Sequence, residues 1–239
     1  MPLEPITTRL EKVVELTPTV RTFHLHCPEG KWVSFKGGQF CSIHIPQPGK
    51  ILRKPYSIAS APYETGTIDL CIKRVEGGAA TNWFWSLKKG DKVVITFPYG
   101  GFVIKEPVDY NPIFIATGTG LAPLRSMILE LFHKKCQREI TLIFGVRYEN
   151  EILYDEEWRK LSAFHKNFCY IPVVSRPQKQ GPSGWAGEVG YVQDVLKRRV
   201  RPEGKQIYVC GLIPMITAVE KAAAEIGFDK GHVHFEKYV

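Results

Sequence analysis

The sequence predicts two domains of different architecture: an antiparallel β-barrel over residues 1–107, followed by a parallel α/β sheet over residues 108–239. Two observations lead to this division. Short segments of alternating apolar and polar residues, separated by Gly and Pro turns, fill the first hundred residues. After about Pro107, compact apolar strands alternate with helix-length segments instead. A chain of 239 residues is long enough for two domains of ordinary size.

The barrel is predicted from segments with a period of two, because successive side chains of a strand point to opposite faces of a sheet. These segments are 19–26, 40–45, 67–75 and 92–97. The turns between them are marked by Gly37-Gly38, Pro46–Gly49 and Gly100-Gly101. Even strand spacing with such turns is typical of an antiparallel barrel. We expect one helix within it, from Ala80 to about Leu87.

The second half is predicted to be a doubly wound sheet. The expected strands are 112–116, 140–144, 168–174, 206–210 and 232–235. The expected helices are 121–135, 155–164, 191–199 and 214–226. Apolar strands that alternate with helices form parallel sheets covered on both faces, as in Rossmann-like domains. The stretch 178–187 is the most loop-like part of the chain.

Composition and cysteine spacing argue against several classes of protein. No apolar run approaches the roughly 18 residues that a membrane helix needs, so we expect no membrane insertion. The six cysteines are scattered without a C-x-x-C pair, so the sequence predicts neither a metal site nor an iron–sulfur cluster. The N-terminus has neither a basic start nor an apolar core, which favours a cytoplasmic location.

The net charge of +8 suits nucleic acid, anionic lipid or an acidic protein as a partner. Nucleic acid is not favoured, because no dense Lys/Arg tract with interleaved aromatic residues is present. The tightest basic run, 197–201, falls at an expected helix end, where cations complement the helix dipole. An acidic protein partner or phosphorylated ligands would account for the excess of positive charge without nucleic acid.

Two glycine-rich segments have the context of phosphate sites. Gly77-Gly78-Ala79-Ala80-Thr81 precedes the helix of the barrel, and two glycines there let backbone amides approach an anion. Thr117-Gly118-Thr119-Gly120-Leu121-Ala122-Pro123 follows an apolar strand and opens a helix, which favours a dinucleotide site. Each segment could instead be a turn that caps a helix.

Three further motifs complete a recognisable pattern. They are Arg53-Lys54-Pro55-Tyr56-Ser57-Ile58-Ala59-Ser60, Cys210-Gly211 with Met215, and Glu236-Lys237-Tyr238. Together with the two glycine loops, and in this order, they resemble the ferredoxin–NADP reductase superfamily of flavoproteins over nearly the whole chain. The resemblance implies FAD in the barrel, NADP(H) in the parallel-sheet domain, and hydride transfer between the two rings.

The resemblance places a flavin site at the end of one barrel strand. Tyr56 would give the flavin ring a stacking surface, and Ser57 would give it a hydrogen bond. In the superfamily an arginine two residues before this tyrosine binds the flavin pyrophosphate. Here that residue is Lys54, and Arg53 precedes it, so either side chain could take the phosphate. The other expected flavin-binding residues are Ile72, Lys73, Val75, Gly78, Ala80 and Thr81.

The resemblance also places a nicotinamide site in the second half. Cys210 would lie against the nicotinamide ring, Glu236 would relay a proton with Ser57, and Tyr238 would stack on the flavin. Ser57, Cys210 and Glu236 are therefore the expected catalytic residues. Val239 extends the chain by one residue beyond the Glu-x-Tyr ending. The residues expected to bind the dinucleotide are Thr117, Gly118, Thr119, Gly120, Pro123, Cys210, Gly211 and Met215.

The choice between NADPH and NADH depends on the adenosine ribose. The 2′-phosphate of NADPH favours Arg, Lys or Ser, and Ser175-Arg176 follows an expected strand where such a pair often lies. Arg147 and Lys179 are further candidates. We therefore expect NADPH, with NADH possible because NADH-dependent members of the superfamily can carry the same pair.

The expected function is that of an FAD-dependent NAD(P)H oxidoreductase. It would pass hydride between NADPH and flavin, and single electrons to or from a small acidic carrier such as ferredoxin or flavodoxin. Three alternatives stay open: the NADH-dependent reductase component of an oxygenase, an electron-transfer subunit of a larger complex, and a reductase of free flavin.

Overall fold

The computed structural model describes residues 3–178 and 184–238. By their contacts they form two compact units. The first, here the barrel unit, runs up to Ile104 and also holds Arg125–Lys134. The second, the sheet unit, holds Lys105–Leu124 and the chain from Lys135 onward.

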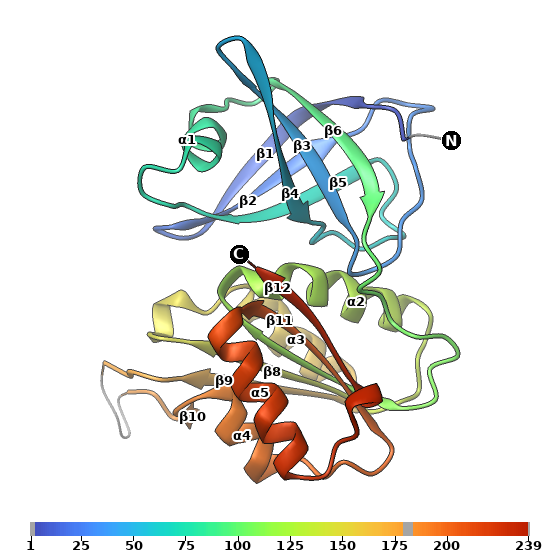
Figure 1. Cartoon of the computed structure of the whole chain (residues 1–239), viewed down its shortest axis with the longest axis vertical. Coiled ribbons are helices and arrows are strands. Elements are labelled where there is room, and N and C mark those ends of the chain that lie inside the picture. The colour runs from blue at the N-terminus through green and yellow to red at the C-terminus, as the bar shows by residue number, and fades with distance from the viewer. Residues whose placement is uncertain (1–2, 179–183, 239) are drawn as a thin grey trace. The chain divides into compact units, whose positions relative to one another are not determined.

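The barrel unit is built on a six-stranded antiparallel sheet (Figure 1). Its strands are β1 (Ile6–Thr17), β2 (Val20–His26), β3 (Phe40–Gln47), β4 (Lys50–Ser57), β5 (Thr67–Lys73) and β6 (Lys92–Tyr99). They are ordered β4-β3-β6-β1-β2-β5, and every neighbouring pair is antiparallel. A bridge between Ile58 and Leu70 joins the end of β4 to β5 and closes the ring. The predicted antiparallel barrel is confirmed.

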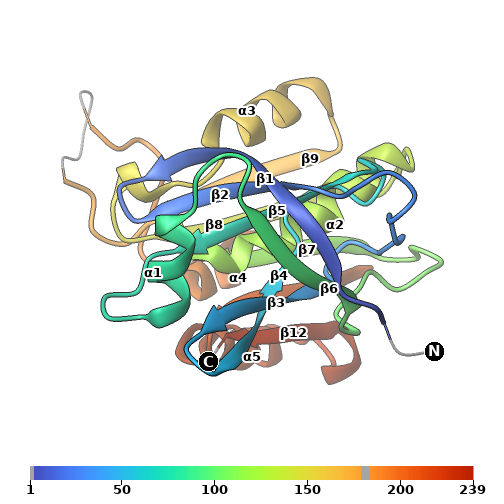
Figure 2. The ribbon, with the colours of Figure 1, turned by 90° about the horizontal axis from the view of Figure 1, so that it is seen from above.

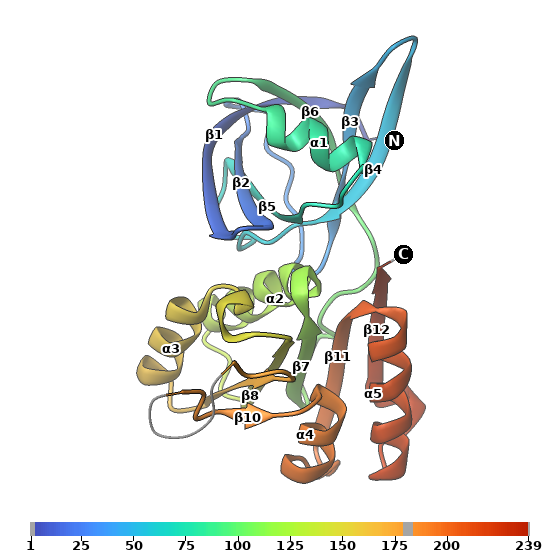
Figure 3. The ribbon, with the colours of Figure 1, turned by 90° about the vertical axis from the view of Figure 1, so that its left-hand side faces the viewer.

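Helix α1 (Ala79–Ser86) contributes to the core of the barrel unit. Figures 2 and 3 show α1 between the β1–β2 and β3–β4 hairpins. Its Phe84 is fully buried and lies 5.0 Å, centroid to centroid, from the ring of Phe23 on β2. An aromatic side chain of this size fixes the helix against the strands, because removing it would leave a large cavity.

Two features of the barrel differ from the sequence-based expectations. Strand β1 was not predicted. One of its buried positions is Thr8, a polar residue whose hydroxyl donates to the carbonyl of Val93, so the sequence does not show a regular alternation of apolar and polar residues. The strand expected over 67–75 ends at Lys73. Its outward-facing Asp69 and Cys71 are also buried, which a strand with one solvent face would not show.

The sheet unit is built on a parallel sheet, as predicted, and it has one strand more than the five expected. Its strands are β7 (Asn111–Thr117), β8 (Ile140–Val146), β9 (Phe168–Val174), β10 (Glu188–Val189), β11 (Lys205–Leu212) and β12 (Val233–Tyr238). They are ordered β10-β9-β8-β7-β11-β12. The order reverses at β7, which has β8 on one side and β11 on the other. Doubly wound sheets bind ligands at the carboxyl ends of the strands beside such a reversal.

The helices of the sheet unit match the predicted segments within about two residues. They are α2 (Leu121–His133), α3 (Asp155–Phe164), α4 (Val192–Arg199) and α5 (Ile213–Glu225), with short 3₁₀ turns at Gly118–Gly120, Glu149–Glu151 and Lys230–His232. Figure 3 shows α4 and α5 on the side of the sheet opposite to α3. Residues of α4 and α5 form one buried cluster with Ile113 and Ile115 of β7.

Among the residues that the structure describes, no helix has both the length and the apolar character of a membrane span. The same residues contain no group of three His, Cys, Asp or Glu side chains that could hold a metal ion. All six cysteines lie in the described part of the chain, and they form no disulfide.

Candidate flavin and nicotinamide sites

Tyr56 and Ser57 lie at the carboxyl end of β4, where the strand passes into the interior. The half-buried ring of Tyr56 meets Phe84 edge to face at 5.2 Å. Its backbone carbonyl accepts a hydrogen bond from the Cys41 thiol, 3.5 Å away. Burial raises the pKa of Tyr56 to about 12, so its hydroxyl is neutral at physiological pH. Tyr56 is therefore a fixed, uncharged aromatic surface, and Ser57 beside it is buried.

The rest of β4 has no buried side chain from Lys50 to Pro55. Directly paired residues of antiparallel strands share a face, and Lys54 pairs with buried Ile43 while Arg53 pairs with His44. Lys54 therefore shares its face with Tyr56, and Arg53 projects from the other face. Burial, with the charge of Arg53, lowers the pKa of His44.

The loop between β5 and α1 is fixed by Thr81. Its hydroxyl accepts a hydrogen bond from the Val75 N–H at 3.2 Å and has the carbonyls of Val75 and Gly78 within 3.0 and 3.1 Å. Gly78 is the N-cap residue of α1 and makes no side-chain cap bond to the first amides of the helix. Those amides can donate hydrogen bonds to an anion. The sequence predicted Thr81 as a cofactor ligand, and the structure assigns its hydroxyl to the loop.

Three other predicted flavin-site residues lie around this loop. Ile72 is buried near the end of β5, Lys73 is exposed at its last position, and Ala80 is half-buried in the first turn of α1. Val75 is 57% exposed.

The loop after β7 lies against the end of β11. A side chain on Gly120 would overlap the carbonyl group of Cys210, so only glycine fits. The space beside the α-carbon of Gly211 is taken by the hydroxyl of Thr117 and the Met215 methyl group. The structure thus brings together the predicted dinucleotide residues of both segments, with Gly118 and Thr119 in the 3₁₀ turn and Pro123 buried in the first turn of α2.

Cys210 occupies the centre of this edge of the sheet. It pairs with Ala116 of β7 on one side and with Glu236 of β12 on the other. Burial raises the pKa of the Cys210 thiol, and the charge of Glu236 raises it further. The Tyr238 hydroxyl bonds to the thiol and lies 3.5 Å from the carbonyl of Thr119. A neutral thiol, a carboxylate and a phenol therefore meet beside the glycine loop.

The residues expected near the adenosine ribose also come together. Ser175 and Arg176 follow β9, and their backbone amides donate to the carbonyls of Val146 and Arg147 at 3.0 and 2.8 Å. Arg147 and Arg176 are both exposed at adjacent strand ends. Two guanidinium groups there suit a phosphate. Lys179 and Val239 lie outside the described residues.

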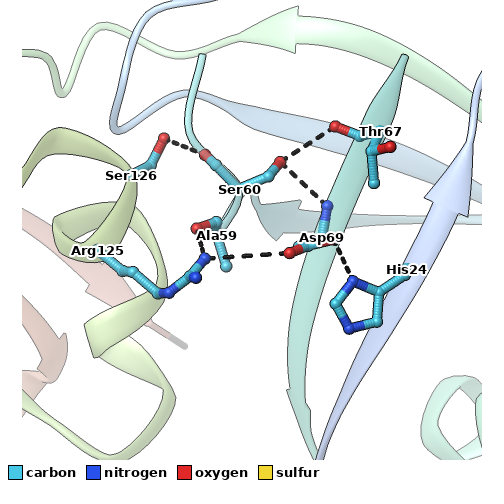
Figure 4. A network of polar contacts seen from close by, with 7 residues as sticks. All are labelled: His24, Ala59, Ser60, Thr67, Asp69, Arg125 and Ser126. Atoms are coloured by element: carbon cyan, nitrogen blue, oxygen red, sulfur yellow. Dashed lines mark hydrogen bonds and ion pairs between the residues drawn. The ribbon is translucent and has the colours of Figure 1, made fainter. Parts of the chain in front are cut away.

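Sequence reasoning missed a polar network in the barrel unit. It joins His24, Ala59, Ser60, Asp69, Arg125 and Ser126 (Figure 4). No short motif marks its members outside the Arg53–Ser60 segment, and Arg125 looks like any polar position on a predicted helix. The burial of Asp69 would have pointed to them, and that comes only from the fold.

Two family models match the chain. The model described as an oxidoreductase FAD-binding domain covers residues 7–104, and the model described as an oxidoreductase NAD-binding domain covers residues 114–221. The sequence is 35% identical over 244 residues to ferredoxin–NADP reductase B of Sorangium cellulosum, a match that covers 98% of each chain.

A second relative is DmpP, the reductase component of phenol 2-monooxygenase from Pseudomonas sp., at 34% identity over 220 residues. That match covers 91% of this chain but only 61% of DmpP, so the chain spans less than two thirds of the oxygenase reductase. The two relatives therefore differ in how much of their length this chain accounts for.

Two solved structures resemble the chain closely. The Amycolatopsis cytochrome P450 reductase GcoB has a TM-score of 0.87 and 28% identity, covering 99% of this chain and 70% of that one. A ferredoxin NADP⁺ reductase from Neisseria gonorrhoeae, solved with bound FAD and NADP, has a TM-score of 0.85 and 22% identity, covering 99% of both. At 22% identity, the match to the Neisseria gonorrhoeae reductase shows a shared fold alone.

Proposed function

Because the chain belongs to the ferredoxin–NADP reductase superfamily of FAD-dependent NAD(P)H oxidoreductases, we propose that it passes electrons between NADPH and a separate one-electron carrier. The observation that carries this proposal is the meeting of Cys210, Glu236 and Tyr238 beside the Thr117–Gly120 loop. Cys210 lies on β11 beside the reversal of strand order at β7, the position at which such sheets bind nucleotides, and Glu236 and Tyr238 lie on the next strand. The full-length similarity to a ferredoxin–NADP reductase supports it.

On the flavin side, the residues of β4 and α1 bind and orient. FAD, when bound, accepts a hydride and releases electrons singly. Lys54 would hold the pyrophosphate, because it shares its face with Tyr56, and the first amides of α1 would add hydrogen bonds. Tyr56 would lie against the flavin ring, and Ser57 would donate a hydrogen bond to it.

On the nicotinamide side, the neutral thiol of Cys210 would pack against the reactive ring without adding charge. Thr119 and Gly120 would hold the carboxamide and pyrophosphate through their backbone amides. Glu236 would hold or release a proton near the rings, with Ser57 as its predicted partner. Tyr238 would cover the flavin until nicotinamide displaces it, a role that rests on the family resemblance.

The preference for NADPH rests on Arg147, Ser175 and Arg176. An exposed arginine that bonds to the 2′-phosphate contributes about 1.5 to 3 kcal/mol. Replacing Arg176 with Ala should therefore raise KM for NADPH on the order of 10-fold and leave KM for NADH unchanged. Equal effects on both nucleotides would contradict a phosphate contact.

The partner, the compartment and the domain boundary are part of the proposal. A net charge of +8 favours a small acidic carrier such as ferredoxin or flavodoxin. Six cysteines without a disulfide fit the reducing cytoplasm. We place the boundary between the FAD-binding and NAD(P)-binding domains at residues 107 and 108. The FAD-binding family model ends before this boundary, at residue 104, and the NAD-binding model begins after it, at residue 114.

An anaerobic titration tests the proposed function. The purified protein, reconstituted with FAD, should lose its visible flavin absorption with about one equivalent of NADPH. A parallel titration with NADH measures the preference. A protein that fails to take up FAD would overturn the proposal. Reduced enzyme should then pass electrons to an added acidic ferredoxin in a salt-sensitive reaction, since exposed charges are screened.

A second candidate is the NADH-dependent reductase of an oxygenase. The similarity to DmpP favours it, although this chain spans only 61% of that protein. Equal or faster flavin reduction by NADH, with no electron transfer to ferredoxin, would select this candidate.

A further inference from the structure

Helix α2 is anchored to the barrel unit from Arg125 onward. The contacts that hold it reach the backbone of Ala59 and Ser60, two and three residues after Ser57 (Figure 4). Both residues are fully buried. A buried carbonyl needs a hydrogen-bond partner, and here the partners come from a helix far away in sequence.

Arg125 supplies the first of these contacts. Its Nη1 donates to the carbonyl oxygen of Ala59 at 2.6 Å and lies 4.0 Å from Oδ2 of Asp69. The side chains of Arg125 and Asp69 are only 14% and 9% exposed. The Nδ1 atom of His24 lies 2.7 Å from the other carboxylate oxygen, a close contact that lacks hydrogen-bond geometry. The Arg125 guanidinium thus lies between the Ala59 carbonyl and the Asp69 carboxylate, and its contact with Ala59 is a hydrogen bond.

Ser126 and Ser60 supply the second contact. The Ser126 hydroxyl donates to the carbonyl oxygen of Ser60 at 2.6 Å. The Ser60 hydroxyl accepts from the Asp69 N–H at 3.1 Å and donates to the carbonyl of Thr67 at 3.3 Å. The Ala59 N–H completes the set by donating to the carbonyl of Asp69 at 2.8 Å. The chain just after Ser57 is thus bonded to β5 and to α2 at once.

The rest of the helix lies on the same unit. Glu130 accepts a hydrogen bond from the Gly37 N–H at 2.8 Å, and the ring of His133 stacks on Tyr63 at 4.0 Å. Anchors at positions 125, 126, 130 and 133 follow the helical repeat, so one face of α2 is attached along its length. The helix cannot shift along the barrel without breaking several of these contacts.

We infer that Arg125 and Ser126 are positioning residues for hydride transfer. The inference rests on the proposed function. Helix α2 begins at Leu121, directly after the Thr117–Gly120 loop, and its next turn bonds to the segment that follows Tyr56 and Ser57. One helix therefore contains both the residues that follow the nicotinamide-side loop and the residues that bond to the flavin-side chain. Hydride transfer is sensitive to such placement, since an error of about 1 Å can cost on the order of 100-fold in rate.

The test compares Arg125→Ala, Arg125→Lys and Ser126→Ala with the wild type, all loaded with FAD. Stopped-flow flavin reduction over a range of NADPH concentrations gives two separate values: the limiting rate and the NADPH concentration at half-saturation. Absorbance at long wavelength reports the stacked nicotinamide–flavin complex. Arg159→Ala is the matched control, because Arg159 forms an exposed i,i+4 pair with Asp155 on α3.

We expect Arg125→Ala to lower the limiting rate about 10- to 100-fold and to weaken the long-wavelength band, with half-saturation changed less than about 3-fold. Ser126→Ala should lose about 2- to 10-fold in the limiting rate, the value of one hydrogen bond. Arg125→Lys keeps the buried charge opposite Asp69, so it should fold like the wild type. Because Lys lacks the planar guanidinium group, the limiting rate of this variant should lie between those of Arg125→Ala and the wild type.

The outcomes are distinguishable from those of the proposed function. A wild-type protein that NADPH and NADH both fail to reduce overturns the proposed function. If the wild type is reduced and folded Arg125→Lys and Ser126→Ala both react at its rate with an unchanged band, the positioning role is wrong. An equal loss in Arg159→Ala would also overturn it.

Discussion

Cys210 lies in register with Glu236 across the parallel strands β11 and β12. The thiol is fully buried, and a carboxylate beside it opposes a second negative charge. Both effects raise the pKa of the thiol, which therefore stays protonated through the physiological range. Cys210 is thus unsuited to nucleophilic chemistry, which needs a thiolate, and suited to packing against a ring.

We expect the rate of hydride transfer to show no thiol titration between about pH 7 and 9, because the pKa of Cys210 is raised out of that range. Cys210→Ala should slow transfer about 10-fold or more by loosening the ring's packing, and Cys210→Ser should be milder. Stopped-flow reduction at several pH values measures both. Cys169→Ala, which changes an exposed cysteine, should match the wild type. A thiolate-dependent rise in rate would contradict the packing role.

Alkaline pH should destabilise the fold through its buried thiols. Burial raises the pKa of Cys27 to about 11 and raises that of Cys41 as well. The unfolded chain ionises near pH 8.5 while the folded thiols keep their protons. Their contribution is therefore complete below about pH 8.5 and is lost as pH rises toward the folded pKa, by about 1.4 kcal/mol per pH unit for each thiol.

Urea unfolding at pH 8, 9 and 10 measures this slope. Cys41→Ala should be less stable at every pH because of the small cavity, yet its stability should fall less steeply with pH. An unchanged slope in that variant would show that Cys41 does not carry the effect.

Thr81→Val should weaken FAD binding. The change keeps the side-chain shape but leaves the Val75 N–H without its bond to the hydroxyl, at a cost of about 1 to 3 kcal/mol. The loop before α1 would then loosen. Thr81→Ser keeps the hydroxyl and should retain FAD like the wild type. Equilibrium dialysis or flavin fluorescence compares the three, and equal loss in both variants would contradict the hydrogen-bond explanation.

Gly120→Ala should impair nucleotide binding and spare the flavin. The added methyl group would overlap the Cys210 carbonyl, so the loop must move, at a cost of about 1 to 3 kcal/mol. We expect weaker NADPH binding and slower reduction, measured by anaerobic titration. Gly231→Ala is the control, since open space surrounds that position. Normal NADPH affinity in Gly120→Ala would mean that the loop tolerates displacement.

The sequence predicted what local patterns determine. Glycines and threonines at strand ends marked the Thr117–Gly120 loop, and alternation with period two marked most barrel strands. It did not predict β10, whose two residues have too short a pattern to detect and are defined by pairing with β9. Nor did it settle Arg53 against Lys54, because a β-bulge before Tyr56 would exchange their faces; the pairing of β3 with β4 is regular there.

The Arg125 network was out of reach for a different reason. Arg125 is 66 residues from Ala59, and hydrogen bonds over that separation leave no periodicity in the sequence. Only burial distinguishes Asp69 from an ordinary outward-facing strand residue, and burial depends on the tertiary fold.

Gly37 has a consequence for how the protein is made. A side chain there would come within 2.7 Å of the Met127 α-carbon, so the loop and helix α2 touch backbone to backbone. The barrel unit thus includes Arg125–Lys134, which are synthesised some twenty residues after Ile104. A fragment ending at residue 107 would present the carbonyls of Ala59 and Ser60 without their donors. The N-terminal half is therefore complete only after the Arg125–Lys134 part of α2 has been synthesised.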